Sequence, residues 1–395
     1  MAKIISHRLF GDIFVSVAVL LSILSLLMFP TQSVDAAKTG LELCANVIIP
    51  SLFPFFVLSG LIVQMGLVRH LGRLLQPVMK PLFNVGGSCS AAFALGFIGG
   101  YPVGAVTAIN LYKKGWCSKD EAERLLAFCN NSGPAFILGV VGAGIFSSSV
   151  IGIMLYLAHI LSSVLVGMLF RFRKSKVSAV SKPVLQETET ASGFASAFTD
   201  CVKNAAASTI NICAFVIFFT VVIKMLFLTG VMDAASSVVA VILSPLGFNA
   251  QWAEKLLIGL IEMSSGVWSL SGAACTLTGK LSMAAFILGW AGVSVHCQVL
   301  SFIGGSGLSA RTYVVGKALH GIISAGLVYI ISKFFSLGQP VSHYLAQQVN
   351  DIAELDFSTA LTASTVTAFA VWAVVIIISA FMIGKGYGNS RKNGV

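Results

Sequence analysis

Apolar side chains fill this chain in long blocks, and most charged residues gather between the blocks. Several blocks reach about 20 residues, the length that a helix needs to cross a bilayer. Apolar and polar residues do not alternate within the blocks, as they would in the strands of a membrane barrel. Because lipid offers backbone groups no partners, each block must satisfy its own hydrogen bonds as a helix. The pattern predicts an all-α, polytopic membrane protein.

Composition strengthens this prediction. Hydrophobic residues make up 56% of the 395 residues and charged residues only 10%, against about 25% charged residues in soluble domains. A soluble fold of this size would lack polar side chains to cover its core. The net charge is +10. The lysines and arginines of the chain lie mainly between the apolar blocks, where they would hold loops in the cytoplasm. We therefore expect the lipid bilayer, and no nucleic acid, as a partner.

The order of blocks and charges predicts a topology with both termini in the cytoplasm, eight spans and two hairpins. The block Leu9–Pro30 is longer than the 7–15 residues of a signal-peptide core, so we expect it to be retained as a span within residues 1–35. Leu41–Met65 then returns, with a kink at Pro50 and Pro54. Leu67–Phe83 carries basic residues at helical spacing, which predicts an amphipathic helix on the cytoplasmic face.

The next block, Gly86–Tyr112, is interrupted by the glycine-rich stretch Gly99–Gly104. If the block crossed the membrane, the lysines after it would lie outside, against the positive-inside rule. A re-entrant hairpin with its tip at Gly99–Gly104 removes this conflict. Ser118 and Glu121 then form a capping-box pattern that begins a helix.

That helix is interrupted at Asn130–Pro134 and resumes through Phe136–Ile145, which predicts a broken span. A second half repeats this order of elements, because Gly259–Gly266 follows Gly96–Gly104 at an offset of about 163 residues. Its second interruption is expected around Gly289–Gln298. The predicted organisation is an N-terminal transmembrane helix (1–35), a first repeat (39–172), a cytoplasmic linker (173–197), a second, inverted repeat (198–335) and a C-terminal transmembrane helix (358–384).

Paired interruptions in two inverted repeats are the best sequence indicator of a transporter site. Backbone groups freed by an interruption must face protein, water or a solute, and the N-terminus of a resumed half-helix attracts anions. In the first half the glycines could alternatively serve close helix packing. The side-chain amides of Asn130 and Asn131 could alternatively form hydrogen bonds to neighbouring helices. The candidate substrate-binding residues there are Gly99, Gly100, Tyr101, Pro102, Gly104, Asn130, Asn131, Ser132 and Gly133.

In the second half the strongest candidate is Glu262, because intramembrane carboxylates are usually functional. Glu262 could bind a coupling cation or proton, or it could lie at a wet helix end. His296 has a competing role as a satisfied core histidine. The candidate substrate-binding residues of this half are Glu262, Ser264, Ser265, His296 and Gln298.

The sequence contains no pattern for catalysis or for a resident metal. Its eight cysteines form no C-x-x-C pair, and we find no nucleophile elbow, P-loop or H-E-x-x-H motif. We therefore predict no enzyme and no cofactor, although coupling to Na⁺ or H⁺ is compatible with the pattern. A non-transporting membrane scaffold and an enzyme for lipid-linked substrates are the alternatives. The paired polar interruptions favour a secondary transporter over both.

Five motifs together resemble the YlbJ-type sporulation integral membrane proteins. This family belongs with the nucleoside-recognition, or gate, domain proteins, which resemble the concentrative nucleoside transporters. The resemblance is best over about Thr39 to Arg171, and the second half agrees more in layout than in motif. The motifs are Thr39–Glu42, Ile49–Phe56, Gly99–Ala105, Glu121–Leu125 and Asn130–Pro134.

The resemblance implies a bacterial multi-pass membrane transporter with two inverted repeats, each with a hairpin and an unwound helix. In spore formers the family is tied to moving dipicolinic acid, a small aromatic dianion, from the mother cell towards the forespore. It therefore implies a small-molecule anion or a nucleoside-like solute as partner, and the mother-cell-derived forespore membrane as a location in a sporulating organism. A homo-oligomer is compatible with this reading. We further expect the hairpins and broken helices to move as one body, in the manner of an elevator.

Overall fold

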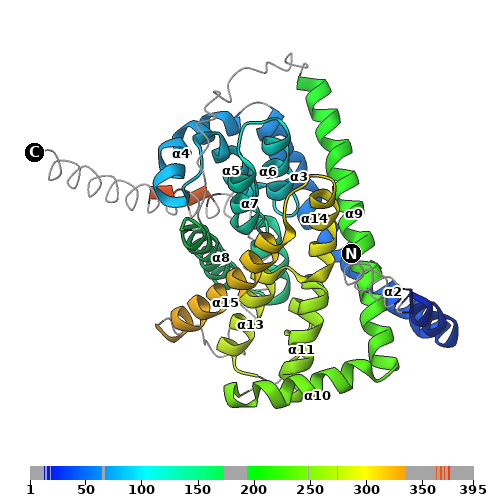
Figure 1. The fold of residues 1–395 in the computed structure, drawn as a ribbon. Coiled ribbons are helices and arrows are strands. Elements are labelled where there is room, and N and C mark those ends of the chain that lie inside the picture. Colours follow the sequence, from blue (N-terminus) through cyan, green and yellow to red (C-terminus); the bar gives the residue numbers. More distant parts are fainter. Residues whose placement is uncertain are drawn as a thin grey trace, which may run out of the picture.

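The computed structural model describes residues 19–64, 67–172, 194–247, 249–273 and 275–334, with isolated positions outside these ranges. All regular structure in these ranges is helical (Figure 1). Four helices there are long and apolar enough to cross a membrane, and two bent helix pairs would raise the number to six. The prediction of an all-α polytopic membrane protein is confirmed. The predicted span 358–384 and most of the linker 173–197 lie outside the described residues.

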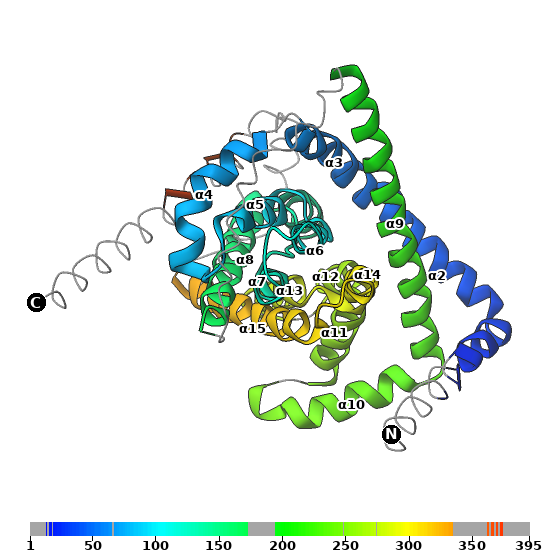
Figure 2. The same cartoon turned by 45° about the horizontal axis from the view of Figure 1, so that its top comes forward.

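An outer layer of helices surrounds an inner bundle (Figure 2). Helices α2 and α3 pack along α9, and the approach is close because a Cβ on Gly40 would lie 3.0 Å from the Cα of Ile217. Only 22% of the most apolar 18-residue stretch of α9 is buried, which leaves the apolar surface of this helix for lipid. The outer layer consists of α2 (Pro30–Leu43), the π-helix η1 (Cys44–Ile48), α3 (Ile49–Gln64), α9 (Phe194–Leu228) and α10 (Val231–Leu243).

The inner bundle contains the same series of elements twice. We call α5, residues 99–102 and α6 hairpin 1, and residues 129–134 break 1. We call α11, Glu262 and α12 hairpin 2. The first series is η2 (Gly87–Cys89), α5 (Ser90–Ile98), α6 (Val103–Lys113), α7 (Lys119–Phe128), the π-helix η3 (Ala135–Ile145) and α8 (Ser149–Phe170). The second is η4 (Ser244–Leu246), α11 (Ala250–Ile261), α12 (Met263–Trp268), α13 (Leu277–Trp290), α14 (Gly292–Gly304) and α15 (Ala310–Phe334).

The second broken helix is interrupted over a shorter stretch than the sequence predicts. Helix α13 ends at Trp290, Ala291 adopts the left-handed conformation with φ 79°, and α14 begins at Gly292. The expected interruption over Gly289–Gln298 is therefore wrong in extent. Because two positive-φ residues are enough to turn the chain here, His296 and Gln298 lie inside α14 rather than in the break.

Glycines allow both hairpins to close tightly. In hairpin 1, a Cβ on Gly104 would lie 2.9 Å from the Cα of Gly96, and in hairpin 2 a Cβ on Gly266 would lie 2.3 Å from the Cα of Gly259. Two helix backbones can approach this closely only where neither carries a side chain. The contact occurs in both hairpins, and it connects the residues from which the sequence repeat was inferred.

Helix α4 (Leu67–Phe83) has the bounds that the sequence predicts. Its described C-terminal half is amphipathic, because Val78 and Met79 are buried while Lys80 is exposed. At its end, the ring of Phe83 stacks on that of Phe128 with centroids 4.6 Å apart. This packing attaches α4 to the inner bundle.

The capping box at the start of α7 is also confirmed. The Ser118 hydroxyl accepts from the Glu121 backbone N–H, and the Glu121 carboxylate accepts from the Ser118 backbone N–H. The same carboxylate accepts from the Gly86 backbone N–H at 2.7 Å. Glu121 thus connects the start of α7 to the segment that leads into hairpin 1.

Candidate functional site

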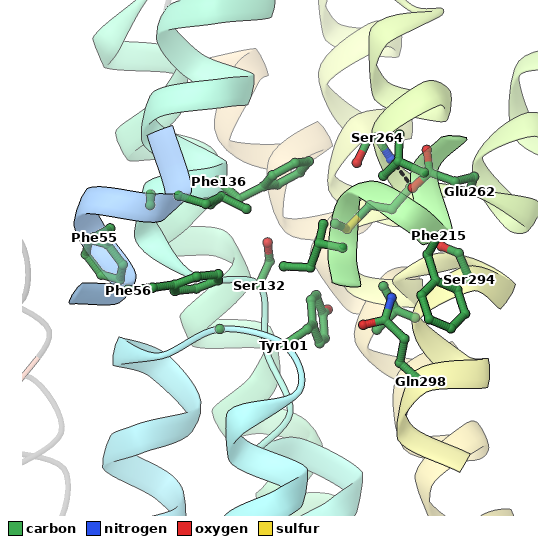
Figure 3. Close-up of a pocket in the computed structure, with 18 residues that line it drawn as sticks. Phe55, Phe56, Tyr101, Ser132, Phe136, Phe215, Glu262, Ser264, Ser294 and Gln298 are labelled. Atoms are coloured by element: carbon green, nitrogen blue, oxygen red, sulfur yellow. Dashed lines mark hydrogen bonds between the residues drawn. The ribbon is translucent and has the colours of Figure 1, made fainter. Parts of the chain in front are cut away.

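A cavity lies where the two hairpins and the two broken helices meet, between the inner bundle and the outer helices α3 and α9 (Figure 3). It holds about 580 Å³ of empty volume, its open mouth included. The lining residues are Leu52, Phe55, Phe56, Gly100, Tyr101, Ser132, Gly133, Ala135, Phe136, Ile212, Phe215, Val216, Glu262, Met263, Ser264, Ser294, Val295 and Gln298.

The sequence-predicted residues from all four interrupted elements converge on this cavity. Hairpin 1 contributes its tip, break 1 contributes a hydroxyl and a glycine, and hairpin 2 contributes its carboxylate. The predicted residues that line the cavity are Gly100, Tyr101, Ser132, Gly133, Glu262, Ser264 and Gln298.

Other predicted residues lie beside the cavity and shape its walls. Gly99 and Pro102 line a second cavity on the other side of the hairpin tip. Gly104 packs against the backbone of Cys129, where its Cβ would meet the carbonyl oxygen at 1.9 Å. Ser265 donates its backbone N–H to the Glu262 carboxylate. These residues support the walls of the first cavity but do not line it.

Asn131 and His296 are also held in the wall. The Asn131 side-chain amide donates to the Phe128 carbonyl at 2.9 Å and to the Ser163 hydroxyl at 3.2 Å. His296 Nδ1 lies 3.0 Å from the Tyr313 hydroxyl. Asn131 therefore bonds break 1 to α7 and α8. Hydrogen bonding of the amides to neighbouring helices is the alternative that the sequence left open.

Glu262 forms the wall of the cavity at the turn of hairpin 2. Its side chain is 2% exposed, and its two carboxylate oxygens accept from the backbone N–H groups of Ser264 and Ser265. The residue is thus the N-cap of α12. Glu262 therefore caps the start of α12 and lines the cavity.

Break 1 presents polar atoms without partners. Ser132 Oγ and Asn131 Oδ1 are buried and have no hydrogen-bond partner within the described part of the chain. The Asn130 amide also lacks one at normal geometry, although the Tyr313 hydroxyl lies close enough to interact with it. Leaving such groups unpaired costs roughly 1–3 kcal/mol each. Ser132 lines the cavity, so a solute or water there would satisfy its hydroxyl.

Aromatic side chains supply most of the remaining wall. Phe55 and Phe56 come from α3, Phe136 from the start of η3 and Phe215 from α9, and the ring of Tyr101 projects between them (Figure 3). Nothing in the sequence distinguishes these phenylalanines, because aromatic residues are common on apolar helices.

A fully buried lysine lies behind the cavity wall. Positive-inside reasoning counts Lys317 among the cytoplasmic charges, and this assignment is wrong because the residue is 1% exposed within α15. Its side-chain nitrogen lies within hydrogen-bond distance of the Tyr101 hydroxyl, the Asn130 carbonyl and His320 Nδ1. An isolated lysine near the start of an apolar helix resembles a topological charge, so the sequence offered no indication of this role.

A second cavity adjoins the first and shares two of its walls. It holds about 820 Å³ of empty volume, its mouth included, and lies between the tip of hairpin 1, α3 and the first turns of α9. Phe56 and Tyr101 line both cavities. Polar side chains of α9, Asn204 and Ser208, line the second one.

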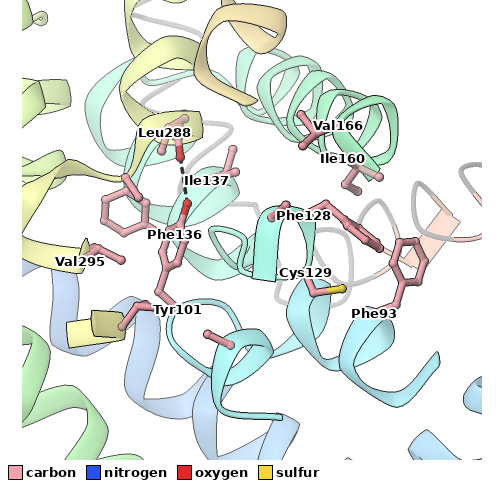
Figure 4. Packing of buried hydrophobic residues seen from close by; sticks show 14 of the residues in the cluster. Phe93, Tyr101, Phe128, Cys129, Phe136, Ile137, Ile160, Val166, Leu288 and Val295 are labelled. Atoms are coloured by element: carbon pink, nitrogen blue, oxygen red, sulfur yellow. Dashed lines mark hydrogen bonds between the residues drawn. The ribbon is translucent and has the colours of Figure 1, made fainter. Parts of the chain in front are cut away.

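Tyr101 also joins the two halves of the chain. Its hydroxyl donates to the Leu288 carbonyl of α13 at 3.0 Å (Figure 4). Around it, Phe136 and Val295 belong to the same continuous hydrophobic core. The tip of hairpin 1 is therefore anchored in the second repeat.

Comparison with known proteins agrees with this architecture. A family model described as Gate, nucleoside recognition, matches residues 45–176, which include hairpin 1 and break 1. The chain resembles solved structures of the concentrative nucleoside transporter CNTnw. In its intermediate 3 state the TM-score is 0.57 at 12% sequence identity, covering 83% of this chain and 86% of that chain. In an inward-facing, substrate-bound state it is 0.52 at 13% identity, covering 73% and 75%. These likenesses establish the fold.

A relative of known family lies closer in sequence. The sporulation integral membrane protein YlbJ of Bacillus subtilis (strain 168) is 32% identical over 320 residues, which cover 77% of this chain and 78% of that protein. These homologues are membrane proteins of transporter or sporulation type and not enzymes. Because this identity extends over most of both chains, the protein belongs to the YlbJ family of sporulation integral membrane proteins.

Proposed function

We propose that this protein is a secondary transporter for a small, planar aromatic solute that carries anionic or strongly polar groups. Dipicolinate is the first candidate and a nucleoside-like solute is the second. The observation that carries the proposal is one cavity in which aromatic rings and uncapped helix N-termini occur together.

Two half-helices begin at the cavity with backbone N–H groups that no side chain caps. Helix η3 starts at Ala135 and α14 at Gly292, and neither has a side-chain cap. Their first turns line the cavity through Phe136 and Ser294. Such ends carry partial positive charge and favour anions. The third start, at α12, is already occupied by the Glu262 carboxylate, so anion binding falls to the other two.

The aromatic lining supports a planar solute. Aromatic side chains stack on flat rings with offset or edge-on geometry, and the cavity has them on α3, η3 and α9. Ser132, Ser294 and Gln298 supply hydrogen-bonding groups among the rings (Figure 3). A pyridine dicarboxylate or a nucleobase would fit this combination, whereas an aliphatic ion would leave the rings without a partner.

Access to the site would require the inner bundle to move against the outer helices. The cavity lies at that boundary, with α3 and α9 on one side and the interrupted elements on the other. Moving the hairpins and breaks together keeps their polar backbone covered. Phe56 and Tyr101 separate the two cavities, so we propose that they form a thin gate.

Proteoliposomes with the purified protein test this proposal. We expect saturable uptake of labelled dipicolinate that unlabelled dipicolinate inhibits, with labelled uridine as the second arm. Uridine uptake without dipicolinate uptake would reassign the substrate to the nucleoside class. Uptake of neither solute, by protein that remains monodisperse and folded, would favour the scaffold alternative.

Replacing Glu262 with alanine should lower uptake by about tenfold, equivalent to about 1.4 kcal/mol. The substitution leaves the backbone N–H groups of Ser264 and Ser265 without acceptors at the cavity wall. Initial uptake rates, normalised to the amount of folded protein, measure the effect. The matched control is Glu254→Ala on α11, where a partly exposed carboxylate pairs with Lys255. Wild-type uptake by Glu262→Ala would remove this residue from the proposed site.

A further inference from the structure

Lys317 lies about two turns into α15 with an exposed fraction of 1%. Its Nζ lies 2.9 Å from the Tyr101 hydroxyl, 3.0 Å from the Asn130 carbonyl oxygen and 3.3 Å from His320 Nδ1. These groups belong to hairpin 1, break 1 and α15. One amine therefore connects three elements that the sequence separates by up to 216 residues.

The partners of these groups fix the direction of each hydrogen bond. The Tyr101 hydroxyl donates to the Leu288 carbonyl, so towards Lys317 it acts as an acceptor. His320 Nε2 lies 2.9 Å from the His159 carbonyl, which only accepts, so Nε2 carries the hydrogen. In the neutral ring, Nδ1 is then an acceptor. Lys317 therefore faces three acceptors, and a protonated amine has three N–H donors.

The network continues to break 1 through His159. The backbone N–H of Ser132 donates to His159 Nε2 at 3.1 Å, which makes this ring neutral too. The rings of His159 and His320 lie 4.3 Å apart. Within the described residues, no carboxylate lies at ion-pair distance from Lys317. The Lys317 nitrogen thus faces a carbonyl oxygen, a hydroxyl oxygen and a ring nitrogen, all of which can accept a hydrogen bond from it.

We propose that Lys317 is a built-in cation that fastens the tip of hairpin 1 to break 1, so that the site is assembled without a bound metal ion. Both ends of the network, Tyr101 and Ser132, line the cavity. The network assembles the cavity that the proposed function treats as the transport site. The inference rests on the proposed function only for the role of that cavity. Lys317 is a positioning residue, because it acts through Tyr101 and break 1.

Two consequences distinguish this role from ordinary packing. The hairpin tip and break 1 should be equally ordered whether the medium contains Na⁺, K⁺ or only choline, because the cation belongs to the chain. The positive charge of Lys317 should also contribute to the order of the hairpin tip and break 1, beyond the contribution from the volume of its side chain. Lys317→Met retains most of the volume, and Lys317→Gln retains N–H donors without the charge.

Hydrogen exchange of the purified protein in nanodiscs, without any substrate, tests the proposal. In wild-type protein, peptides covering residues 99–103 and 130–133 should exchange at the same rate in NaCl, KCl and choline chloride. In Lys317→Met and Lys317→Gln, these peptides should exchange about tenfold faster, while peptides of α9 should not change. The control is Lys333→Met, at an exposed lysine on the same helix, which should match the wild type.

Three outcomes would overturn the proposal. The first is exchange in wild-type peptides 99–103 and 130–133 that Na⁺ slows tenfold relative to choline. This measurement needs no variant, so it decides the matter even if Lys317→Met does not fold. The second is wild-type exchange in Lys317→Met, and the third is wild-type exchange in Lys317→Gln. Because no solute is present, failure here is distinguishable from failure of the proposed transport, which proteoliposome uptake measures separately.

Discussion

Replacing Gly104 with alanine should prevent the inner bundle from forming. The new Cβ would lie 1.9 Å from the Cys129 carbonyl oxygen and 2.9 Å from the Cα of Gly96. Both neighbours are backbone, so no flexible side chain can move aside. Overpacking of this kind costs about 3 kcal/mol or more, a large part of a total stability of about 5–15 kcal/mol. We expect the yield of monodisperse protein in size-exclusion chromatography to fall by at least about tenfold.

The control for this effect is another helical glycine. Gly326 lies within α15, and a Cβ there would meet nothing within 4 Å. Gly326→Ala should match or slightly exceed the wild-type yield, because alanine is favoured over glycine in a helix by about 1 kcal/mol. Equal yields for Gly104→Ala and Gly326→Ala would show that the hairpin does not depend on this backbone contact.

Replacing Gly100 with leucine should abolish uptake while the protein still inserts and folds. Gly100 has φ +70°, and its Cβ would lie 3.1 Å from the backbone nitrogen of Gly133. Leucine would therefore force the hairpin tip away from break 1, at the point where both line the cavity. Substrate uptake in proteoliposomes should fall below about a hundredth of the wild-type rate, a loss of roughly 3 kcal/mol.

Gly115 offers a control with the same backbone conformation. It also has φ +70°, but a Cβ there would meet nothing within 4 Å. Gly115→Leu therefore carries the same left-handed strain, about 1–2 kcal/mol, without crowding the cavity. It should retain most of the uptake. If the two variants lost uptake equally, strain rather than closure of the tip on break 1 would explain the result.

The elements with local signatures could be predicted from the sequence. The Ser118–Glu121 capping box, the amphipathic helix Leu67–Phe83 and the interruption at Asn130–Pro134 each depend on residues close together in the chain. Their physical causes act within one or two helical turns. Local patterns were therefore sufficient to locate hairpin 1 and break 1.

The features that were missed depend on distant contacts. Lys317 meets Asn130 across 187 residues, and nothing near Lys317 in the sequence distinguishes it from a loop lysine. His159 and His320 are isolated polar residues on long apolar helices, and only the fold brings their rings together. The second break is formed by Ala291 and Gly292, both at positive φ, a conformation that alanine disfavours.

The contacts between the repeats also set an order for biogenesis. When a ribosome has completed α8, the Asn130 carbonyl and the Tyr101 hydroxyl have been made, but Lys317 and Leu288 have not. The nascent first half therefore enters the lipid with polar groups whose partners are still to be synthesised. Until α13 and α15 follow, the insertion machinery or trapped water must shelter this half. A premature stop between the repeats would release a fragment that quality-control proteases can recognise by its exposed polar backbone.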